Sequence, residues 1–140
     1  MSAKFFLDTH VFVYSFDRRN PTKQKKAQSL IDKALSDHSG LISSQVVQEF
    51  LNVALRKFEK PLPLPESRAY LDVVLAPLCE VFPSVQLYHH ALELQDQAGF
   101  GFYDSLIIAS AAEGSCKILY SEDLQHNQRI AGLTIQNPFL

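Results

Sequence analysis

Sulfur-containing residues and tryptophan are scarce in this chain of 140 residues, which has two cysteines, one methionine and no tryptophan. Cys79 and Cys116 have no second cysteine or histidine at metal-binding spacing, which argues against a zinc site. Neither thiol has a neighbouring base, so a cysteine nucleophile is not expected. We therefore expect two free, buried thiols in a protein from a reducing compartment.

Long apolar runs are also missing. No stretch approaches the roughly 20 apolar residues of a membrane-spanning helix. The N-terminal residues Met-Ser-Ala-Lys-Phe-Phe-Leu-Asp become charged too early for a signal peptide. These absences predict a cytoplasmic protein with no membrane partner. The formal net charge is −2, so no overall basic field attracts nucleic acid, although a local basic patch is compatible with that total.

Several common catalytic motifs are absent as well. The chain has no glycine-rich phosphate loop and no Gly-x-Ser-x-Gly nucleophile motif. Its five histidines show no metal-binding spacing, since His89 and His90 are adjacent and His10, His38 and His126 are scattered. We expect most of these histidines to be solvated or partly buried.

The apolar residues that are present alternate between short buried strands and longer helices. Strands that are apolar on both faces are typical of a parallel sheet covered by helices. Because no linker or internal repeat divides the chain, we predict one α/β domain over residues 1–140. Strands are predicted at 4–7, 40–43, 80–82, 117–120 and 133–135. Helices are predicted at 11–16, 21–36, 45–59, 66–76, 85–98 and 102–113.

The helix predicted at 102–113 is apolar around almost its whole circumference, so we expect it to be buried. Asp104 lies in its first turn, and apolar side chains surround it at helical spacing. Interaction with the helix dipole is worth only about 0.3–1 kcal/mol, whereas desolvating an ion costs several kcal/mol. We therefore expect a metal ion, a basic partner or a raised pKa at Asp104.

Three further acids stand where a parallel sheet would bring them together. Asp8 ends the first strand, Glu49 lies early in the helix after the second, and Asp123 follows strand 117–120. The C-terminal ends of parallel strands share one edge of the sheet, and a helix starting there would add Asp104. Because four carboxylates repel one another, we predict that hard divalent cations with oxygen ligands bind between them.

The acids also have structural alternatives, which the sequence leaves open. Asp8 can cap the helix that follows it. Glu49 can be a solvated residue at the margin of its helix's apolar face. Asp123 can be a first-turn acid behind a Ser121 cap. The combined pattern favours a shared site over three independent structural roles.

Phosphodiester hydrolysis is the reaction that uses clustered carboxylates and divalent cations without a protein nucleophile. Basic side chains on the neighbouring segments could hold a phosphate backbone, and an ordinary solvated helix face is the alternative. These basic residues are Arg18, Arg19, Lys23, Lys25, Lys26, Arg56, Lys57 and Lys60.

On these residues the sequence resembles the PIN-domain family, and specifically the VapC-type toxins of bacterial and archaeal toxin–antitoxin pairs. The resemblance is carried by Phe6-Leu7-Asp8-Thr9, Gln48-Glu49-Phe50 and Phe102-Tyr103-Asp104-Ser105-Leu106-Ile107. It continues through Leu119-Tyr120-Ser121-Glu122-Asp123-Leu124-Gln125-His126 and Ile135-Gln136-Asn137-Pro138-Phe139, so it runs essentially from end to end. The last two segments, in this order, are the most specific.

The resemblance implies a three-layer α/β/α fold around a mostly parallel sheet of four to five strands. It implies an endoribonuclease that depends on Mg²⁺ or Mn²⁺, acts as a toxin and is usually a homodimer. It also implies a small VapB-type antitoxin whose C-terminal arm lies over the active site. The RNA contacts that we single out on this basis are Arg18, Arg19, Lys23 and Arg56.

The resemblance extends to individual site residues. The family's four acidic positions, which are catalytic and bind the metal, are matched by Asp8, Glu49, Asp104 and Asp123. Thr9 and Ser121 match oxygen-bearing residues that often support them. Two departures are His10, where the family usually has Asn, and Asn127, where a glycine is common. Glu122 stands beside Asp123 and competes with it for the metal; we favour Asp123.

Two other functions need comparison with this one. A phospho-receiver module is also doubly wound around a pocket of acids, but it needs paired acids after the first strand and a lysine at the end of the last. Here a single acid, Asp8, follows the first strand, and Ser121-Glu122-Asp123 follows the strand at 117–120. The remaining alternative is a PIN-fold protein without nuclease activity that acts as a binding module. The presence of all four acids favours the enzyme.

Overall fold

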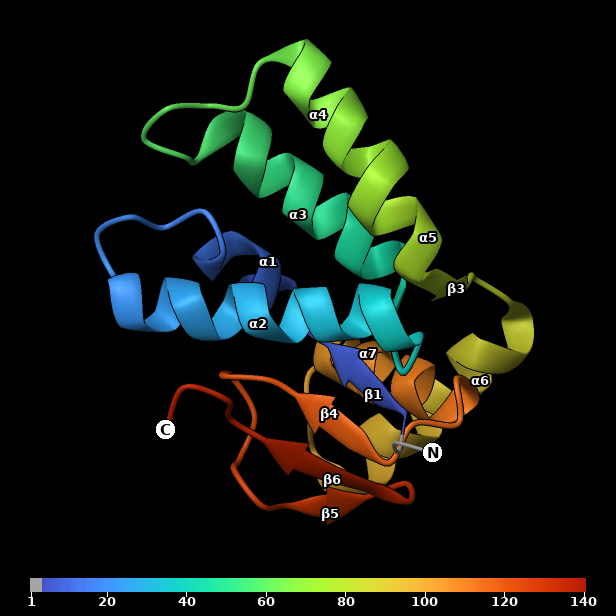
Figure 1. Cartoon of the computed structure of the whole chain (residues 1–140). Coiled ribbons are helices and arrows are strands. Elements are labelled where there is room, and N and C mark those ends of the chain that lie inside the picture. The colour runs from blue at the N-terminus through green and yellow to red at the C-terminus, as the bar shows by residue number, and fades with distance from the viewer. Residues whose placement is uncertain (1–3) are drawn as a thin grey trace.

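A six-stranded sheet in the order β3-β2-β1-β4-β6-β5 forms the centre of the molecule (Figure 1). The structure is a computed structural model that describes residues 4–140; residues 1–3, part of the segment considered above as a signal peptide, lie outside it. The strands are β1 (Phe5–Leu7), β2 (Gly40–Ser43), β3 (Cys79–Val81), β4 (Ile118–Tyr120), β5 (Arg129–Ile130) and β6 (Leu133–Gln136). Neighbouring strands are parallel except for the antiparallel pair β5–β6.

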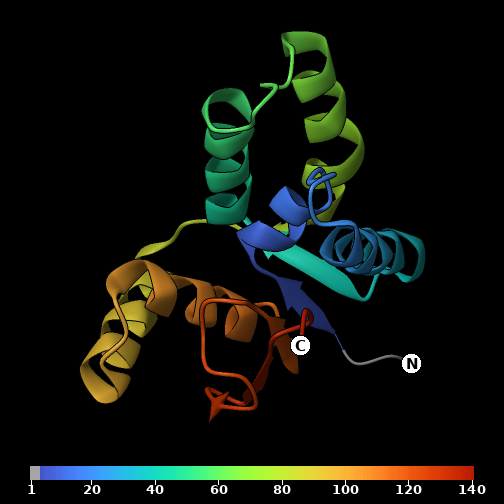
Figure 2. The same ribbon diagram turned by 90° about the vertical axis from the view of Figure 1, so that its left-hand side faces the viewer.

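Helices cover both faces of this sheet. They are α1 (Thr9–Tyr14), α2 (Pro21–Asp37), α3 (Ser44–Arg56), α4 (Leu64–Tyr70), the π-helical turn η1 (Leu71–Leu75), α5 (Ala76–Leu78), α6 (Val85–Ala98) and α7 (Phe102–Glu113). Figure 2 shows α2 on one side of β1 and β2 and the α6–α7 pair on the other. The expected three-layer α/β/α fold with a mostly parallel sheet is therefore confirmed.

Burial on both faces explains the apolar composition of the strands. Phe6, Leu41, Leu119 and Ile135, one from each of the four central parallel strands, are almost completely buried. Gly40 allows β2 to pack closely, because a Cβ atom there would overlap the side chains of Ala34 and Phe5. The strands are only two to four residues long, so the residue after each strand already lies at the edge of the sheet.

Two elements differ from the sequence prediction. The helix predicted at 66–76 is a longer run from α4 through η1 to α5, and the sheet has six strands rather than four to five. The unexpected strand, β5, has only two residues and joins β6 through Ala131 and Gly132, both at positive φ (53° and 77°). Positive φ at both positions is the geometry of a type I′ hairpin turn, usually formed by Asn-Gly or Gly-Gly. Because Ala131 stands where Asn or Gly is usual, the sequence does not indicate this turn.

The structure also bears on two narrower expectations, which concern the cysteines and membrane-spanning helices. Cys116 is buried and Cys79 partly buried, and both are free, as predicted. Within residues 4–140, no helix is both long enough and apolar enough to span a bilayer.

The topology places a crevice beside β1. The chain moves from β1 to β2 and β3 in one direction and then returns to place β4 on the opposite side of β1. Such a reversal in strand order is where open α/β sheets bind ligands, outside the C-terminal ends of the strands. Asp8 follows β1 and Ser121 follows β4, so both lie at this position.

Candidate active site

Asp8 is the buried centre of the site. It follows β1 and is the N-cap of α1, where its Oδ1 accepts a hydrogen bond from the backbone N–H of Thr9 at 2.7 Å. Its Oδ2 accepts a second hydrogen bond, at 2.8 Å, from the hydroxyl of Ser121. The helix-cap role left open by the sequence is therefore present, and it fixes a carboxylate that is only 7% exposed. Each oxygen keeps a lone pair for a further ligand.

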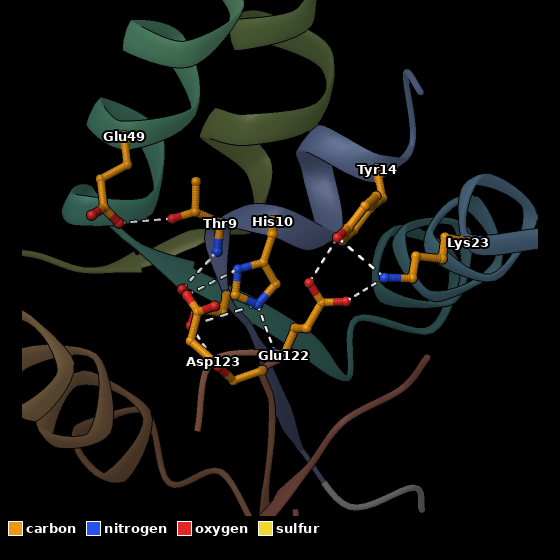
Figure 3. A network of polar contacts seen from close by, with 9 residues as sticks. Thr9, His10, Tyr14, Lys23, Glu49, Glu122 and Asp123 are labelled. Atoms are coloured by element: carbon orange, nitrogen blue, oxygen red, sulfur yellow. Dashed lines mark hydrogen bonds and ion pairs between the residues drawn. The ribbon is translucent and has the colours of Figure 1, made fainter. Parts of the chain in front are cut away.

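His10 joins the two strand ends. Its Nε2 accepts a hydrogen bond from the backbone N–H of Glu122 at 2.7 Å, and its Nδ1 lies 3.5 Å from Asp123 Oδ2 (Figure 3). Because Nε2 accepts, this nitrogen carries no proton, and the proton of the neutral ring is on Nδ1, facing Asp123. The 4.0 Å approach of Nε2 to Asp8 Oδ2 is accordingly not an ion pair in this arrangement. His10 thus holds the segment after β4 against the start of α1.

Asp8, His10 and Asp123 form a group in which one side-chain oxygen or nitrogen atom of each lies within 4.8 Å of those of the other two. Because His10 Nε2 accepts the Glu122 N–H and Nδ1 carries the proton, the two carboxylates are the available ligands for a divalent cation, and His10 positions them. Oxygen ligands about 2.1 Å from Mg²⁺ lie roughly 3–4 Å apart, so small side-chain movements bring the two carboxylates into range. Asp123 is largely exposed, with 69% of its side chain accessible, and is free to make that adjustment.

Glu49 lies next to this group. It is half-buried in the second turn of α3, and its Oε1 accepts a hydrogen bond from the hydroxyl of Thr9 at 2.8 Å (Figure 3). Thr9 thereby contacts two of the predicted acids, donating its backbone N–H to Asp8 and its side chain to Glu49. Glu49 is therefore tied to the sheet edge by a hydrogen bond.

The prediction that apolar side chains surround Asp104 is wrong. Its helix, α7, is buried from Ser105 to Ala111, but Asp104 itself is exposed and does not point into an apolar cluster. The reason is that Tyr103 and Asp104 lie on the exposed side of the first turn of α7, whereas Phe102 in the same turn packs against the core. Partial burial still raises its pKa, and the negative charges of Asp8 and Asp123 raise that pKa further. The raised pKa expected for Asp104 is thus present with a smaller burial contribution than the sequence suggested.

Glu122 is engaged elsewhere. Its carboxylate accepts hydrogen bonds from the Tyr14 hydroxyl at 2.7 Å and from Lys23 Nζ at 2.8 Å (Figure 3). Burial raises the pKa of Glu122, but these two hydrogen bonds and the charge of Lys23 outweigh it, so the net pKa lies below its usual value. Asp123, and not Glu122, therefore lies beside Asp8.

The same contacts change the picture of the basic residues. Lys23 is paired with Glu122 and lies over the rings of Tyr14 and Phe139, at 4.6 and 5.5 Å from their centres. Lys23 therefore stabilises the fold through these contacts. Because its charge is paired with that of Glu122, Lys23 is a weaker candidate for binding RNA. Arg18, Arg19 and Arg56 are exposed, and within residues 4–140 no ion pair joins them to the acids of the site. The structure does not bring these three arginines into the acidic group.

Sequence reasoning noted His10 only as a departure from the family's usual Asn and gave it no role in the site. The scattered histidines gave no metal-binding spacing, and the one relevant signal was local. His10 follows Asp8 by two residues at the start of a helix, so its side chain remains at the sheet edge. The role of Tyr14 was not predicted either, because its hydrogen-bond partner Glu122 lies 108 residues away in the sequence.

Comparison with known proteins places this chain in a family. The PIN-domain model matches residues 5–132, from β1 to the turn between β5 and β6. The chain belongs to the PIN-domain family. A search among curated proteins gave no significant sequence match.

Solved structures with the same fold include toxin–antitoxin proteins. DNA-bound VapBC from Salmonella typhimurium superimposes with a TM-score of 0.64 at 18% identity, over 96% of this chain and 98% of that one. VapBC2 from Rickettsia felis, bound to a DNA fragment from its promoter, gives 0.59 at 20% identity, over 94% and 96%. VapC20 of Mycobacterium tuberculosis, described as a toxin that cleaves the sarcin–ricin loop, gives 0.59 at 17% identity, over 84% and 88%. At these identities the likeness establishes the fold.

Proposed function

We propose that this protein is a metal-dependent endoribonuclease that acts as the toxin of a VapBC-type toxin–antitoxin pair. The observation that carries the proposal is the group formed by Asp8, His10 and Asp123 at the reversal in strand order, in a chain of the PIN-domain family. Asp8, Glu49, Asp104 and Asp123 are the proposed catalytic and metal-binding residues. Thr9 and Ser121 support them, and Glu122 anchors their segment through Tyr14 and Lys23.

Mg²⁺ or Mn²⁺ suits the donor set, because both are bound by carboxylate oxygens and water. Such a cation, when bound, lowers the pKa of a coordinated water and stabilises charge on the phosphodiester oxygens. Asp8 and Asp123 would hold it most directly. Asp104, whose carboxylate is repelled by the charges of Asp8 and Asp123, would join them in holding the cation, which relieves that repulsion. Glu49, fixed by Thr9, would complete the negative wall of the site.

The substrate and partners follow from the same proposal. The exposed residues Arg18, Arg19 and Arg56 are the candidates for binding those RNA phosphates that lie outside the acidic group. The structural relatives in VapBC complexes support a cognate VapB-type antitoxin as partner, and we extend the proposal to a homodimer in the cytoplasm.

Incubation of the purified protein with bulk RNA tests the reaction. We expect cleavage in Mn²⁺ or Mg²⁺, loss of cleavage in EDTA, and fragments that carry no 2′,3′-cyclic phosphate. Hydrolysis by water leaves a simple phosphate monoester, whereas attack by the neighbouring 2′-hydroxyl leaves the cyclic ester. Cleavage that persists in EDTA, or cyclic ends, would contradict the metal-dependent mechanism. Normal partner binding with no cleavage in any metal would favour the alternative, a binding module with a PIN fold.

A further inference from the structure

Asp123 lies on residues 121–128, a segment without regular secondary structure that joins β4 to β5. Its side chain is 69% exposed, and within residues 4–140 the only group paired with it is His10, whose Nδ1 lies at 3.5 Å. The position of this carboxylate therefore depends on how firmly the backbone of the segment is held. Any freedom of that backbone has to be given up when a cation binds, at a cost in conformational entropy.

The end of β6 and the residue after it hold this segment on both sides of Asp123. Before the acid, the backbone N–H of Ser121 donates a hydrogen bond to the carbonyl of Gln136 at 3.0 Å. After it, the backbone N–H of Asn137 donates to His126 Nδ1 at 2.9 Å. The backbone is therefore fixed two residues before Asp123 and three residues after it.

The turn that follows β6 places Phe139 against α1 and α2. The side chain of Asn137 accepts a hydrogen bond from the backbone N–H of Phe139 at 2.9 Å, which fixes this turn. The half-buried Phe139 ring packs edge to face against the ring of Tyr14, with centres 4.8 Å apart, and lies 5.5 Å from Lys23 Nζ. Phe139 therefore contacts both of the side chains that hold Glu122.

Tyr14 and Lys23 keep the carboxylate of Glu122 away from the acidic group. Each donates a hydrogen bond to one of its two oxygens, at 2.7 and 2.8 Å (Figure 3). A released Glu122 would compete with Asp123 for a cation, and the segment would lose its attachment one residue before that ligand. The contacts of Tyr14 and Lys23 therefore bear directly on where Asp123 lies.

We infer that Phe139 and Lys23 are positioning residues of the metal site. They touch neither the cation nor the RNA, and they act through Glu122 to hold Asp123 beside Asp8. This inference rests on the proposed function and adds to it that side chains outside the acidic group set part of its affinity for metal. It also gives Lys23 a role in the site that is separate from binding RNA.

The sign of the effect at Lys23 distinguishes positioning from simple electrostatics. Removal of a positive charge near an acidic site would by itself strengthen the binding of a cation. Loss of a positioning contact weakens that binding instead. Lys23→Arg should bind nearly as the parent does, because a guanidinium keeps the charge, donates to a carboxylate and packs on aromatic rings.

Isothermal titration with Mn²⁺, with Tm measured in EDTA, tests the inference without RNA. Phe139→Ala and Lys23→Met should each raise Kd for Mn²⁺ about tenfold, the lower end of the range for groups that orient metal ligands. The matched controls are Leu140→Ala, at a neighbouring residue that is 83% exposed, and Lys26→Met, at an exposed lysine one turn further along α2. Both controls should leave Kd unchanged.

Leu94→Ala separates positioning from a general loss of stability. Leu94 is buried in α6, so its truncation should lower Tm and leave Kd for Mn²⁺ at the value of the parent. Equal weakening of Mn²⁺ binding in Leu94→Ala would overturn the inference, because the effect would then follow stability. Parent-like Kd in Phe139→Ala and Lys23→Met, or tighter binding by Lys23→Met, would also overturn it and leave the proposed function standing. A parent without affinity for Mn²⁺ would instead refute the proposed function on which the inference rests.

Discussion

Replacement of Asp8 by Asn should abolish metal-dependent RNA cleavage while the protein stays folded. Asn retains an oxygen that accepts from the Thr9 N–H and adds an amide that donates to the Ser121 hydroxyl, so both hydrogen bonds of Asp8 have a substitute. The negative charge is lost, and with it the most buried carboxylate of the acidic group. Loss of an outer partner of a metal ligand typically costs 10–100-fold, so loss of the central carboxylate should exceed about 100-fold.

The measurement is the initial rate of RNA cleavage in Mn²⁺, with circular dichroism and Tm as tests of folding. Asp96→Asn makes the same chemical change on the exposed surface of α6, away from the site, and serves as the control. Cleavage by Asp8→Asn at the rate of the parent would show that the acids at β1 and β4 are not the catalytic centre.

Substitution of His10 by Ala should weaken Mn²⁺ binding by roughly 10–100-fold, the range typical of groups that orient metal ligands. The imidazole accepts the Glu122 N–H and faces Asp123 with its other nitrogen, so its loss frees the segment after β4. The backbone N–H of Glu122 also loses its partner. We expect His10→Gln to recover part of the affinity, because its amide provides one acceptor and one donor.

Isothermal titration with Mn²⁺ measures this effect without any RNA. His89→Ala, which removes an exposed histidine from α6, is the control and should bind as the parent does. Parent-like Mn²⁺ affinity in His10→Ala would mean that the contact between the ring and Asp123 has no part in forming the site.

The sequence predicted the elements whose signals are local and strong. Short strands buried on both faces, and helices with marked caps, lie within a few residues of their predicted positions; α6, with its Ser84 cap and terminal Gly99, matches residue for residue. β5 could not be predicted, because two residues carry no alternating pattern and the turn that forms it contains Ala131 in place of the usual Asn or Gly.

The parallel topology explains why the acids could be grouped from sequence. Asp8 and Asp123 follow adjacent strands β1 and β4, and that relation needs only the sheet order. What could not be predicted depends on contacts between distant segments. The exposure of Asp104 depends on which side of the first turn of α7 faces the core. The roles of His10, Tyr14 and Lys23 depend on the path of the segment after β4, which brings Glu122 to α1 and α2.

Thermal unfolding with and without Mn²⁺ tests the central claim, that the four acids form a preorganised metal site. A ligand at 100 times its Kd adds about 2.7 kcal/mol to the free energy of unfolding, which for a domain of this size raises Tm by several degrees. We expect that rise in the parent. Asp104→Asn should melt higher than the parent in EDTA, because a carboxylate repelled by Asp8 and Asp123 is gone, and should respond less to Mn²⁺. Equal Tm values with and without Mn²⁺ in the parent would contradict the account.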